Sequence, residues 1–408
     1  MNGSNLRPAL CSVLLFLLAG ASAAADRPPT ASLADALSQG KVSLNVRARY
    51  EGVDQTGLKD ADALTLRTRL GFTTAAYQGL KAMVEFENIT SPDGDAYNQA
   101  GLNPGGAGRA VVVDPEGSEV NQVWLAYSAG KTTTTLGRQR LVLDNARFVG
   151  DVGWRQNMQT FDGLTLVNKS LDKTTLTYGY LSRINRIFGD DHAQGNWDSD
   201  SHVLNANYEG FKAGTLTGYA YLLDFDNAAA QSNATYGVSF AGATPLTDAV
   251  KFTYRAEYAA QSDYGSSALN YSTDYYTLEL GLAGKPGAIA VGYEKLGSDN
   301  GVSFRTPLAT LHAFNGWADM FLATPANGIK DTYVKASAGL PGGFGLLAFY
   351  HKFESARLGL DYGSELDIQL TRKLAKNVTG AIKYTGFDPD STGFAKVNKF
   401  WLQADFSY

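Results

Sequence analysis

The 408-residue chain has almost no cysteine and no long apolar run beyond its first residues. Its single cysteine, Cys11, lies inside a short apolar segment near the N-terminus, so the rest of the chain contains nothing that oxidation could join. No later segment approaches the roughly 18 to 20 apolar residues that a transmembrane helix needs. These absences argue against a disulfide-stapled secreted domain and against a helical membrane protein.

The chain also lacks a basic excess. Its 35 lysines and arginines are outnumbered by 40 aspartates and glutamates, which gives a net charge of -5 and argues against nucleic acid as a partner. The four histidines show no spacing typical of a zinc site. Acidic residues crowd segment 190–200, but they match no calcium-loop template, so we expect a solvated loop there, with a calcium site as the alternative. We therefore expect no metal and no cofactor.

The first residues are typical of an export signal. Arg7 precedes an apolar run over residues 9–19, and small residues with an A-x-A-like pattern follow over 21–25. We therefore expect a signal peptide over residues 1–25, a polar periplasmic lead-in over 26–40 and one continuous domain over 41–408.

From residue 41 onward, apolar and polar residues alternate in stretch after stretch. The clearest case is the last segment, 397–408, where Phe400, Leu402 and Phe406 alternate with Trp401 and Gln403. Period-two alternation predicts strands with one apolar and one polar face. A final strand that ends on an aromatic residue is typical of outer-membrane barrels, in which the apolar face meets lipid and the polar face meets a water-filled lumen.

Short and long connections between these segments alternate along the chain. The long ones cover approximately residues 90–118, 141–160, 185–201, 225–233, 260–272, 297–328 and 387–396. This asymmetry predicts an all-β fold: a transmembrane antiparallel β-barrel of about 18 strands, with short periplasmic turns, long extracellular loops and both termini on the periplasmic side. A β-sandwich or propeller would share the alternation but not the one-sided loops.

Two segments carry a more specific resemblance. The first contains LGRQR (136–140), LDNARFVGDVGWRQN (143–157) and QTFDG (159–163), and the second contains GYE (292–294) and FRTPLATLHAFNGWAD (304–319). Both resemble the alginate export family of Gram-negative outer-membrane barrels, over about residues 41–408. The resemblance implies an eighteen-stranded barrel that is a conduit for a polyanionic sugar polymer, with possible periplasmic export partners.

Arginines provide candidate contacts for an anionic substrate. Arg47, Arg49, Arg67 and Arg69 fall on the polar faces of two neighbouring strands. Guanidinium groups bind carboxylates as a planar fork and remain charged in any setting, so they suit passage of uronate or phosphate groups. The alternative is a cross-strand ladder with the glutamates at 85 and 87, which would fill the interior without selecting anything.

A second set of candidates surrounds the first family segment. We expect pore-facing roles for Arg138, Arg140, Arg147, Arg155 and Asp151, although Gly137 leaves open whether Arg138 or Gln139 points inward.

The connection 297–328 is too long to be structureless in a compact fold. Its apolar residues, spaced by three and four, predict one or two short helices in a loop that folds into the barrel mouth, and a surface cap is the alternative. Trp317 and Asp319 could stack on and hydrogen-bond a sugar, with core packing as the alternative role for the tryptophan.

These patterns favour a passive outer-membrane channel in contact with lipid, of the alginate-export type, conducting an anionic saccharide or another anionic solute through an arginine-containing lumen. The alternative is a general or substrate-specific porin that imports small solutes. The sequence has no G-x-S-x-G elbow and no evident Ser–His pairing, so we do not expect an enzyme. The high strand number favours a monomer, because classical trimeric porins have fewer strands.

Overall fold

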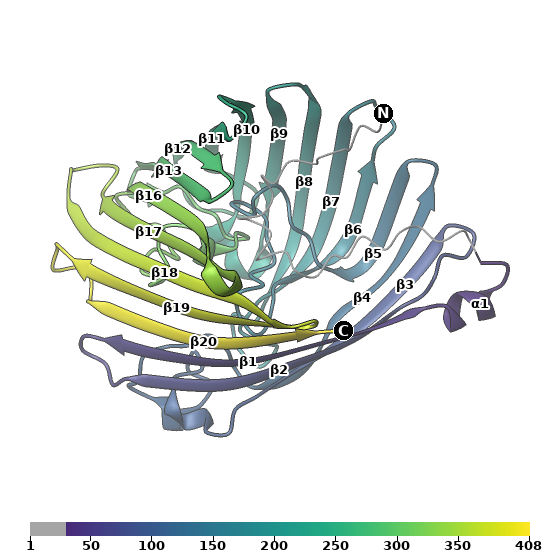
Figure 1. Cartoon of the computed structure of the whole chain (residues 1–408), viewed down its shortest axis with the longest axis horizontal. Helices are drawn as coiled ribbons and strands as arrows, with labels where there is room; N and C mark the ends of the chain where they lie inside the picture. The colour runs from purple at the N-terminus through teal and green to yellow at the C-terminus, as the bar shows by residue number, and fades with distance from the viewer. Residues whose placement is uncertain (1–29) are drawn as a thin grey trace.

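The computed structural model describes residues 30–408, and the expected signal peptide lies outside this range. Eighteen antiparallel strands form one closed sheet (Figure 1). The strands are β1 (Lys41–Gln55), β2 (Ala61–Thr73), β3 (Leu80–Thr90), β4 (Gly117–Ala129), β5 (Thr132–Gln139), β6 (Thr160–Asn168), β7 (Thr174–Asn185), β8 (Asn196–Phe211), β9 (Gly214–Leu223), β10 (Asn233–Pro245), β11 (Val250–Asp263), β12 (Ser272–Gly284), β13 (Gly287–Leu296), β16 (Ile329–Leu340), β17 (Phe344–Glu354), β18 (Asp361–Ala375), β19 (Val378–Pro389) and β20 (Val397–Ser407). The predicted barrel of about 18 strands is confirmed.

Each strand pairs with its neighbour in sequence, and β1 closes the sheet by pairing with β20. Only β13 and β16 are separated by further strands, the two-residue β14 (Ser298–Asp299) and β15 (Val302–Ser303), which form a small hairpin within the connecting loop. Closure leaves no strand edge unpaired, which is the condition for a sheet to cross a membrane.

The two faces of each strand divide as the alternation predicts. In β20, Leu402 is 53% exposed and its side chain faces outward, whereas Trp401 is 1% exposed and its side chain faces the interior. The same parity holds in β1, where Tyr50 faces outward between inward-facing Arg49 and Glu51. Exposed leucines, valines and tyrosines therefore cover the outer surface, while polar and aromatic groups fill the inside.

Short turns lie at one end of the barrel and longer loops at the other. The β2–β3 turn is built on Gln78 and Gly79, whose positive φ values of 50° and 85° give the tight reversal of a two-residue hairpin. Two further connections at the loop end, 56–60 and 355–360, are as short as turns, so the sequence pattern did not predict them as loops.

Helical structure is minor. The six-residue α1 (Leu33–Ser38) precedes β1, capped by the Ser32 side chain, which accepts from the backbone N–H of Asp35. Single 3-10 turns lie in loops: η2 (Gly94–Ala96), η3 (Pro104–Gly106), η4 (Asp226–Gln231), η5 (Leu311–Ala313) and η6 (Pro341–Gly343). Within residues 30–408, no helix has the length and apolar character needed to cross a membrane.

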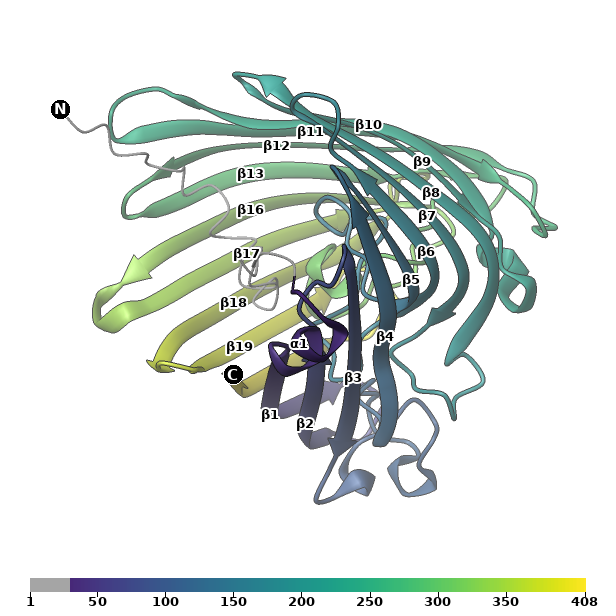
Figure 2. The ribbon, with the colours of Figure 1, turned by 90° about the vertical axis from the view of Figure 1, so that its right-hand side faces the viewer.

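Two long loops fold back into the barrel, and we call them the inner loops: the β5–β6 loop, residues 140–159, and the β13–β16 loop, residues 297–328 (Figure 2). Phe304, Leu308 and Val149 are almost completely buried between them and the wall. One or two short helices were expected in the second loop, and it forms one short helical turn, η5, followed by Gly316 with a positive φ of 86°.

Candidate functional site

The two inner loops are paired with each other through their backbones. Val149 and Leu308 form a parallel bridge, and the Gly150 N–H donates to the Leu308 carbonyl at 2.8 Å. The Thr310 N–H donates to the Ala146 carbonyl at 3.0 Å. The first loop also packs on the wall: the centroid of its Phe148 ring lies 5.2 Å from that of Tyr219 on β9 and 5.3 Å from that of Tyr275 on β12. The loops therefore form one body that crosses the interior.

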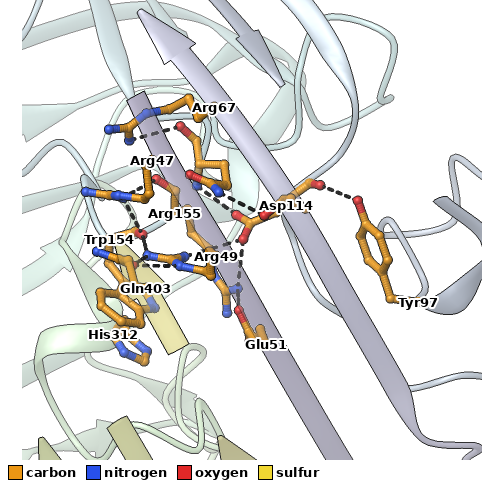
Figure 3. Close-up of polar contacts among 12 residues, drawn as sticks. Arg47, Arg49, Glu51, Arg67, Tyr97, Asp114, Trp154, Arg155, His312 and Gln403 are labelled. Atoms are coloured by element: carbon orange, nitrogen blue, oxygen red, sulfur yellow. Dashed lines mark hydrogen bonds and ion pairs between the residues drawn. The ribbon is translucent and has the colours of Figure 1, made fainter. Parts of the chain in front are cut away.

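The four predicted strand arginines hold this body to the wall. Arg47 Nη1 donates to the Gly153 and Trp154 carbonyls at 3.1 and 3.0 Å, and Arg49 Nη2 donates to the Trp154 carbonyl at 2.6 Å. Arg67 and Arg69 both donate to the Gln156 carbonyl, at 3.4 and 3.1 Å. Figure 3 shows Arg47, Arg49 and Arg67 converging on this loop from β1 and β2.

The same arginines also take part in pairing across strands. Arg47 Nε lies 2.7 Å from Asp405, its register partner on β20, and Arg69 is ion-paired with its register partner Glu87 on β3. The cross-strand ladder is therefore present, but it is only part of the arrangement. Other guanidinium nitrogens of the four arginines donate to the loop carbonyls of Gly153, Trp154 and Gln156, which the inward fold of the loop would otherwise leave unpaired.

Arg155 is the centre of a buried ionic cluster. Its Nη1 lies 3.0 Å from Glu51 and 3.9 Å from Asp114, and its Nη2 lies 3.0 Å from Asp319. Arg49 approaches Asp114 from the other side at 3.4 Å (Figure 3). Burial raises the pKa of Asp114, while the charges of Arg155 and Arg49 act in the opposite direction. Charges this deep need such pairing, and the cluster thereby ties three loops to β1.

Trp317 and Asp319 lie together, as part of a cage around Lys383 of β19. The Lys383 Nζ lies 3.6 Å from the ring centroid of Trp317, 4.2 Å from that of Trp154 and 5.3 Å from that of Trp401. Nζ also donates to His312 Nε2 at 2.6 Å. One cation thus contacts a tryptophan from each inner loop and one from the wall, an arrangement in which cation–π attraction is strong because water is excluded.

His312 and Asp319 complete the cage. His312 Nδ1 lies 2.7 Å from Asp319 Oδ1, and Lys399 Nζ lies 2.7 Å from Asp319 Oδ2. Burial, and then the positive charge of Lys383, hold the pKa of His312 well below its usual value. Burial alone would raise the pKa of Asp319, but the charge of Lys399, the hydrogen bond from His312 and the charge of Arg155 outweigh it and hold that pKa well below its usual value. The pattern indicates a neutral imidazole beside an ionised carboxylate.

Arg147 anchors the inner loops to the wall on the other side of the barrel. Its Nε and Nη2 bind the two oxygens of Glu294 on β13 at 2.8 and 3.0 Å, a bidentate fork, and Nη2 also donates to Asn315 at 3.0 Å. Its guanidinium lies 4.7 Å from the ring centroid of Phe314. The side chain is buried, so it holds structure and offers no free donor fork to a solute.

Arg138 takes a different direction from the expected one. It shares the outward parity of Leu136 and pairs with Asp162 at 2.8 Å, whereas Gln139 faces inward and accepts from Thr165 at 2.7 Å. The positive φ of 122° at Gly137 marks the irregularity that made the sequence ambiguous. The expectation of a pore-facing Arg138 is therefore wrong. Arg140, two residues later, is paired with Asp151 at the start of the inner loop.

Two walls of the barrel differ in charge. On β1 and β2, four arginines face inward beside Glu51; we call this the basic wall. Half the circumference away, on β11, β12, β13 and β16, lies the acidic wall, with two basic residues among four carboxylates. Its charged groups are Arg255, Glu257, Glu279, Glu294, Asp331 and Lys335. A solute between the walls would meet a transverse field.

Four residues of this site were not predicted from the sequence: Lys383, His312, Trp154 and Asp114. An inward-facing Lys383 could have been predicted from the alternation of its strand, because its neighbours Ile382 and Tyr384 are on the apolar outer face. Its tryptophan partners come from three distant segments, which no local pattern connects. Within residues 30–408, no group of three or more His, Cys, Asp or Glu side chains is placed to hold a metal ion.

The chain is similar to a known protein family and to several solved structures. The family model described as "Alginate export" matches residues 38–274. No curated protein sequence matches the chain. Solved structures with a similar fold include Pseudomonas aeruginosa OccK9 (OpdG), at 16% identity and a TM-score of 0.73, covering 91% of this chain and 100% of that one.

Two further structures are alike to a similar degree. Pseudomonas aeruginosa OpdK, solved with vanillate, has 14% identity, a TM-score of 0.71 and coverage of 91% of this chain and 99% of its own. Acinetobacter baumannii OccAB4 has 14% identity, a TM-score of 0.71 and coverage of 90% and 98%. At these identities the likeness concerns the fold, whereas the family model covers more than half of the chain. The chain therefore belongs to the alginate export family, and it is a β-barrel channel of a Gram-negative outer membrane, in contact with outer-membrane lipid.

Proposed function

We propose that the barrel passively conducts an anionic saccharide, an acidic polymer or its oligomers, past the basic wall. The observation that carries this proposal is the partial exposure of three arginine side chains beside the inner loops: 14% for Arg47, 12% for Arg69 and 25% for Arg140. A guanidinium group that keeps some solvent contact can exchange its internal carboxylate for that of a passing uronate. Membership of the alginate export family supports the same substrate class.

The carboxylates near these arginines have a role in this proposal. Arg47 is paired with Asp405 and Arg140 with Asp151, so neither is a free cation. Conduction requires binding that is strong enough for entry and weak enough for release. Competition from an internal carboxylate weakens each contact, which favours movement of a polyanion from one arginine to the next over tight capture.

A second candidate is a porin that imports small anionic solutes. It is favoured by the inner loops, which fill the loop end of the interior and leave less room for a polymer, and by the similar fold of OpdK, which was solved with vanillate, a small carboxylate. Both candidates require anion preference, so the size of the solute separates them.

Anion preference is tested by the reversal potential of single channels in a planar bilayer under a salt gradient. We expect anion preference in the wild type and a marked loss of it in the double variant Arg47→Gln/Arg140→Gln. Arg138→Gln, a nearby arginine that faces outward, is the matched control and should leave the potential unchanged. Glu279→Gln on the acidic wall should shift the potential in the opposite direction. Cation preference in the wild type would refute the proposal.

Solute size is tested by current block with uronic acid oligosaccharides of increasing length, with neutral oligosaccharides of equal length as the control. A saccharide conduit should show blocking events whose duration grows with the number of carboxylates. Block by vanillate-sized carboxylates, with no effect of the oligosaccharides, would instead establish the small-solute porin.

The remaining expectations extend this proposal. We propose that residues 1–25 are removed on export, that 26–40 form the periplasmic lead-in to the barrel at 41–408, and that one chain is the working unit. Support for a monomer comes from the closed sheet, which needs no second copy to complete it. A polymer conduit would also need a periplasmic partner to deliver its substrate.

A further inference from the structure

An apolar groove runs across the outer surface of the barrel, on strands β17 to β20, β1 and β2. Its volume is about 440 Å³, within the roughly 300–1,000 Å³ range of small-molecule sites. Its floor is one register row of small residues, in which Gly380 faces Ala404 and Ala404 faces Ala48. Ile382 and Leu402 form one side and Leu374 the other. The groove therefore exists because this row lacks the large side chains that surround it.

One end of the groove lies at the periplasmic rim. Phe344 lines that end, and it is the first residue of β17 after the turn at η6. The opposite end reaches Tyr50 and Leu64, which lie well inside β1 and β2. Because barrel strands are tilted, a row that follows the pairing register climbs obliquely from the rim toward the middle of the bilayer.

A cation stands at the rim end. Arg372 is the register partner of both Phe344 and Gly380, and its guanidinium lies 4.9 Å from the Phe344 ring centroid. The residue is exposed on the outer face, and among residues 30–408 no carboxylate forms an ion pair with it. Arginine on the lipid face is costly at the midplane but favourable at the level of the phosphate groups. An unpaired guanidinium at this depth matches the charge of a phospholipid headgroup.

We propose that this groove holds one phospholipid of the periplasmic leaflet, with its phosphate on Arg372 and an acyl chain along the floor of Gly380, Ala404 and Ala48. Ala48 and Ala404 let the chain lie close to the backbone, Leu374 packs over Gly380, and the flanking leucine and isoleucine side chains contact the chain from both sides. The basic group lies at the end of the groove where the headgroup must be, and the apolar lining continues in the direction in which the chain must run.

The proposal is tested on the purified full-length barrel by native mass spectrometry, after incubation in mixed micelles of detergent and phosphatidylglycerol. Arg372→Gln removes the partner of the phosphate, and Ala48→Leu/Ala404→Leu fills the floor while keeping an apolar outer face. Matched controls are Lys212→Gln, in the exposed β8–β9 turn, and Ala256→Leu, an outward-facing alanine of β11. The heat-dependent gel mobility of each variant confirms that its barrel is folded.

We expect the wild type and both controls to retain one tightly held phospholipid. Apparent affinity should fall about fivefold in Arg372→Gln, as expected for loss of one basic residue near the lipid surface. It should fall further in the filled-groove variant. Equal retention in all five proteins would overturn the proposal. Loss in the filled-groove variant without loss in Arg372→Gln would remove the phosphate contact, and a dimer that the filled groove abolishes would assign the groove to a second copy of the chain.

Discussion

The loop end and the turn end of the barrel interior differ in what they contain. At the loop end, wall groups such as Glu51, Asp331 and Lys383 are at most 3% exposed, because the inner loops cover them. Toward the turn end, the side chains of Arg255 and Glu279 are 22% and 27% exposed. The wall is built from the same alternating strands throughout. The passage is therefore restricted by the loops, and the wall supplies the charges that a solute meets.

The largest effect should come from removing the body that fills the loop end. Replacing residues 304–322 by a short Gly-Ser linker removes Leu308, Trp317 and Asp319, and with them the contacts to both walls. We expect a several-fold increase in single-channel conductance, since an eighteen-stranded barrel is wide enough to conduct freely. A folded variant with unchanged conductance would show that the second inner loop does not restrict the passage.

Breaking the ionic cluster at the basic wall should mainly reduce stability. Arg155→Gln leaves Glu51, Asp114 and Asp319 without their shared cation, so we expect a loss of about 3–5 kcal/mol in the free energy of unfolding. Arg140→Gln, which loses a single and more exposed partner, is the control and should cost about 1 kcal/mol or less. Thermal unfolding of the detergent-solubilised barrel measures both, and equal losses would contradict the central position of Arg155.

Lys383→Met should loosen the inner loops without emptying the interior. Methionine fills a similar space but gives up the attraction to Trp154 and Trp317, about 2 kcal/mol for desolvated contacts of this kind. We expect frequent brief openings in single-channel records. Lys335→Met is the control: its Nζ lies 5.7 Å from the ring centroid of the half-buried Phe349 and outside the cage, so the quiet wild-type trace should be kept. A quiet trace in Lys383→Met would show that the cage does not hold the loops.

The smallest effect should be a pH dependence at the same cage. His312 has a pKa held well below its usual value, so it stays neutral in the folded barrel, whereas the unfolded chain takes up a proton below about pH 6.5. Its contribution to stability is therefore complete above that pH and is lost as the pH falls toward the folded pKa, by at most about 1.4 kcal/mol per pH unit.

Unfolding midpoints between pH 7.5 and 5 test this dependence. His312→Gln should show a flatter profile than the wild type. Asp319 adds nothing in this range, because its pKa is held well below its usual value and it titrates only under more acidic conditions. A wild-type slope in His312→Gln would exclude the imidazole as the origin.

The architecture could be predicted almost completely from the sequence, and the site only in part. Strand parity identified Arg47, Arg49, Arg67 and Arg69 as inward-facing, and the structure places them there. Parity failed at Arg138, because the backbone at Gly137 departs from extended geometry just where the strand joins an irregular loop. The partners of the inward-facing arginines could not be predicted, since loop carbonyls at Gly153 and Gln156 carry no signal in a side-chain pattern.

The sequence by itself determined the barrel, its two faces and its even number of strands. The reason is that side-chain direction alternates with each residue of a strand. The position of a residue in this alternation therefore decides whether its side chain faces lipid or the lumen. The tertiary structure alone decided which charges meet. Lys383 stands between tryptophans at 154, 317 and 401, and Arg155 joins carboxylates at 51, 114 and 319. These groups come together only because the closed sheet and its inward-folded loops bring distant segments into one dry space, where each charge must find a partner.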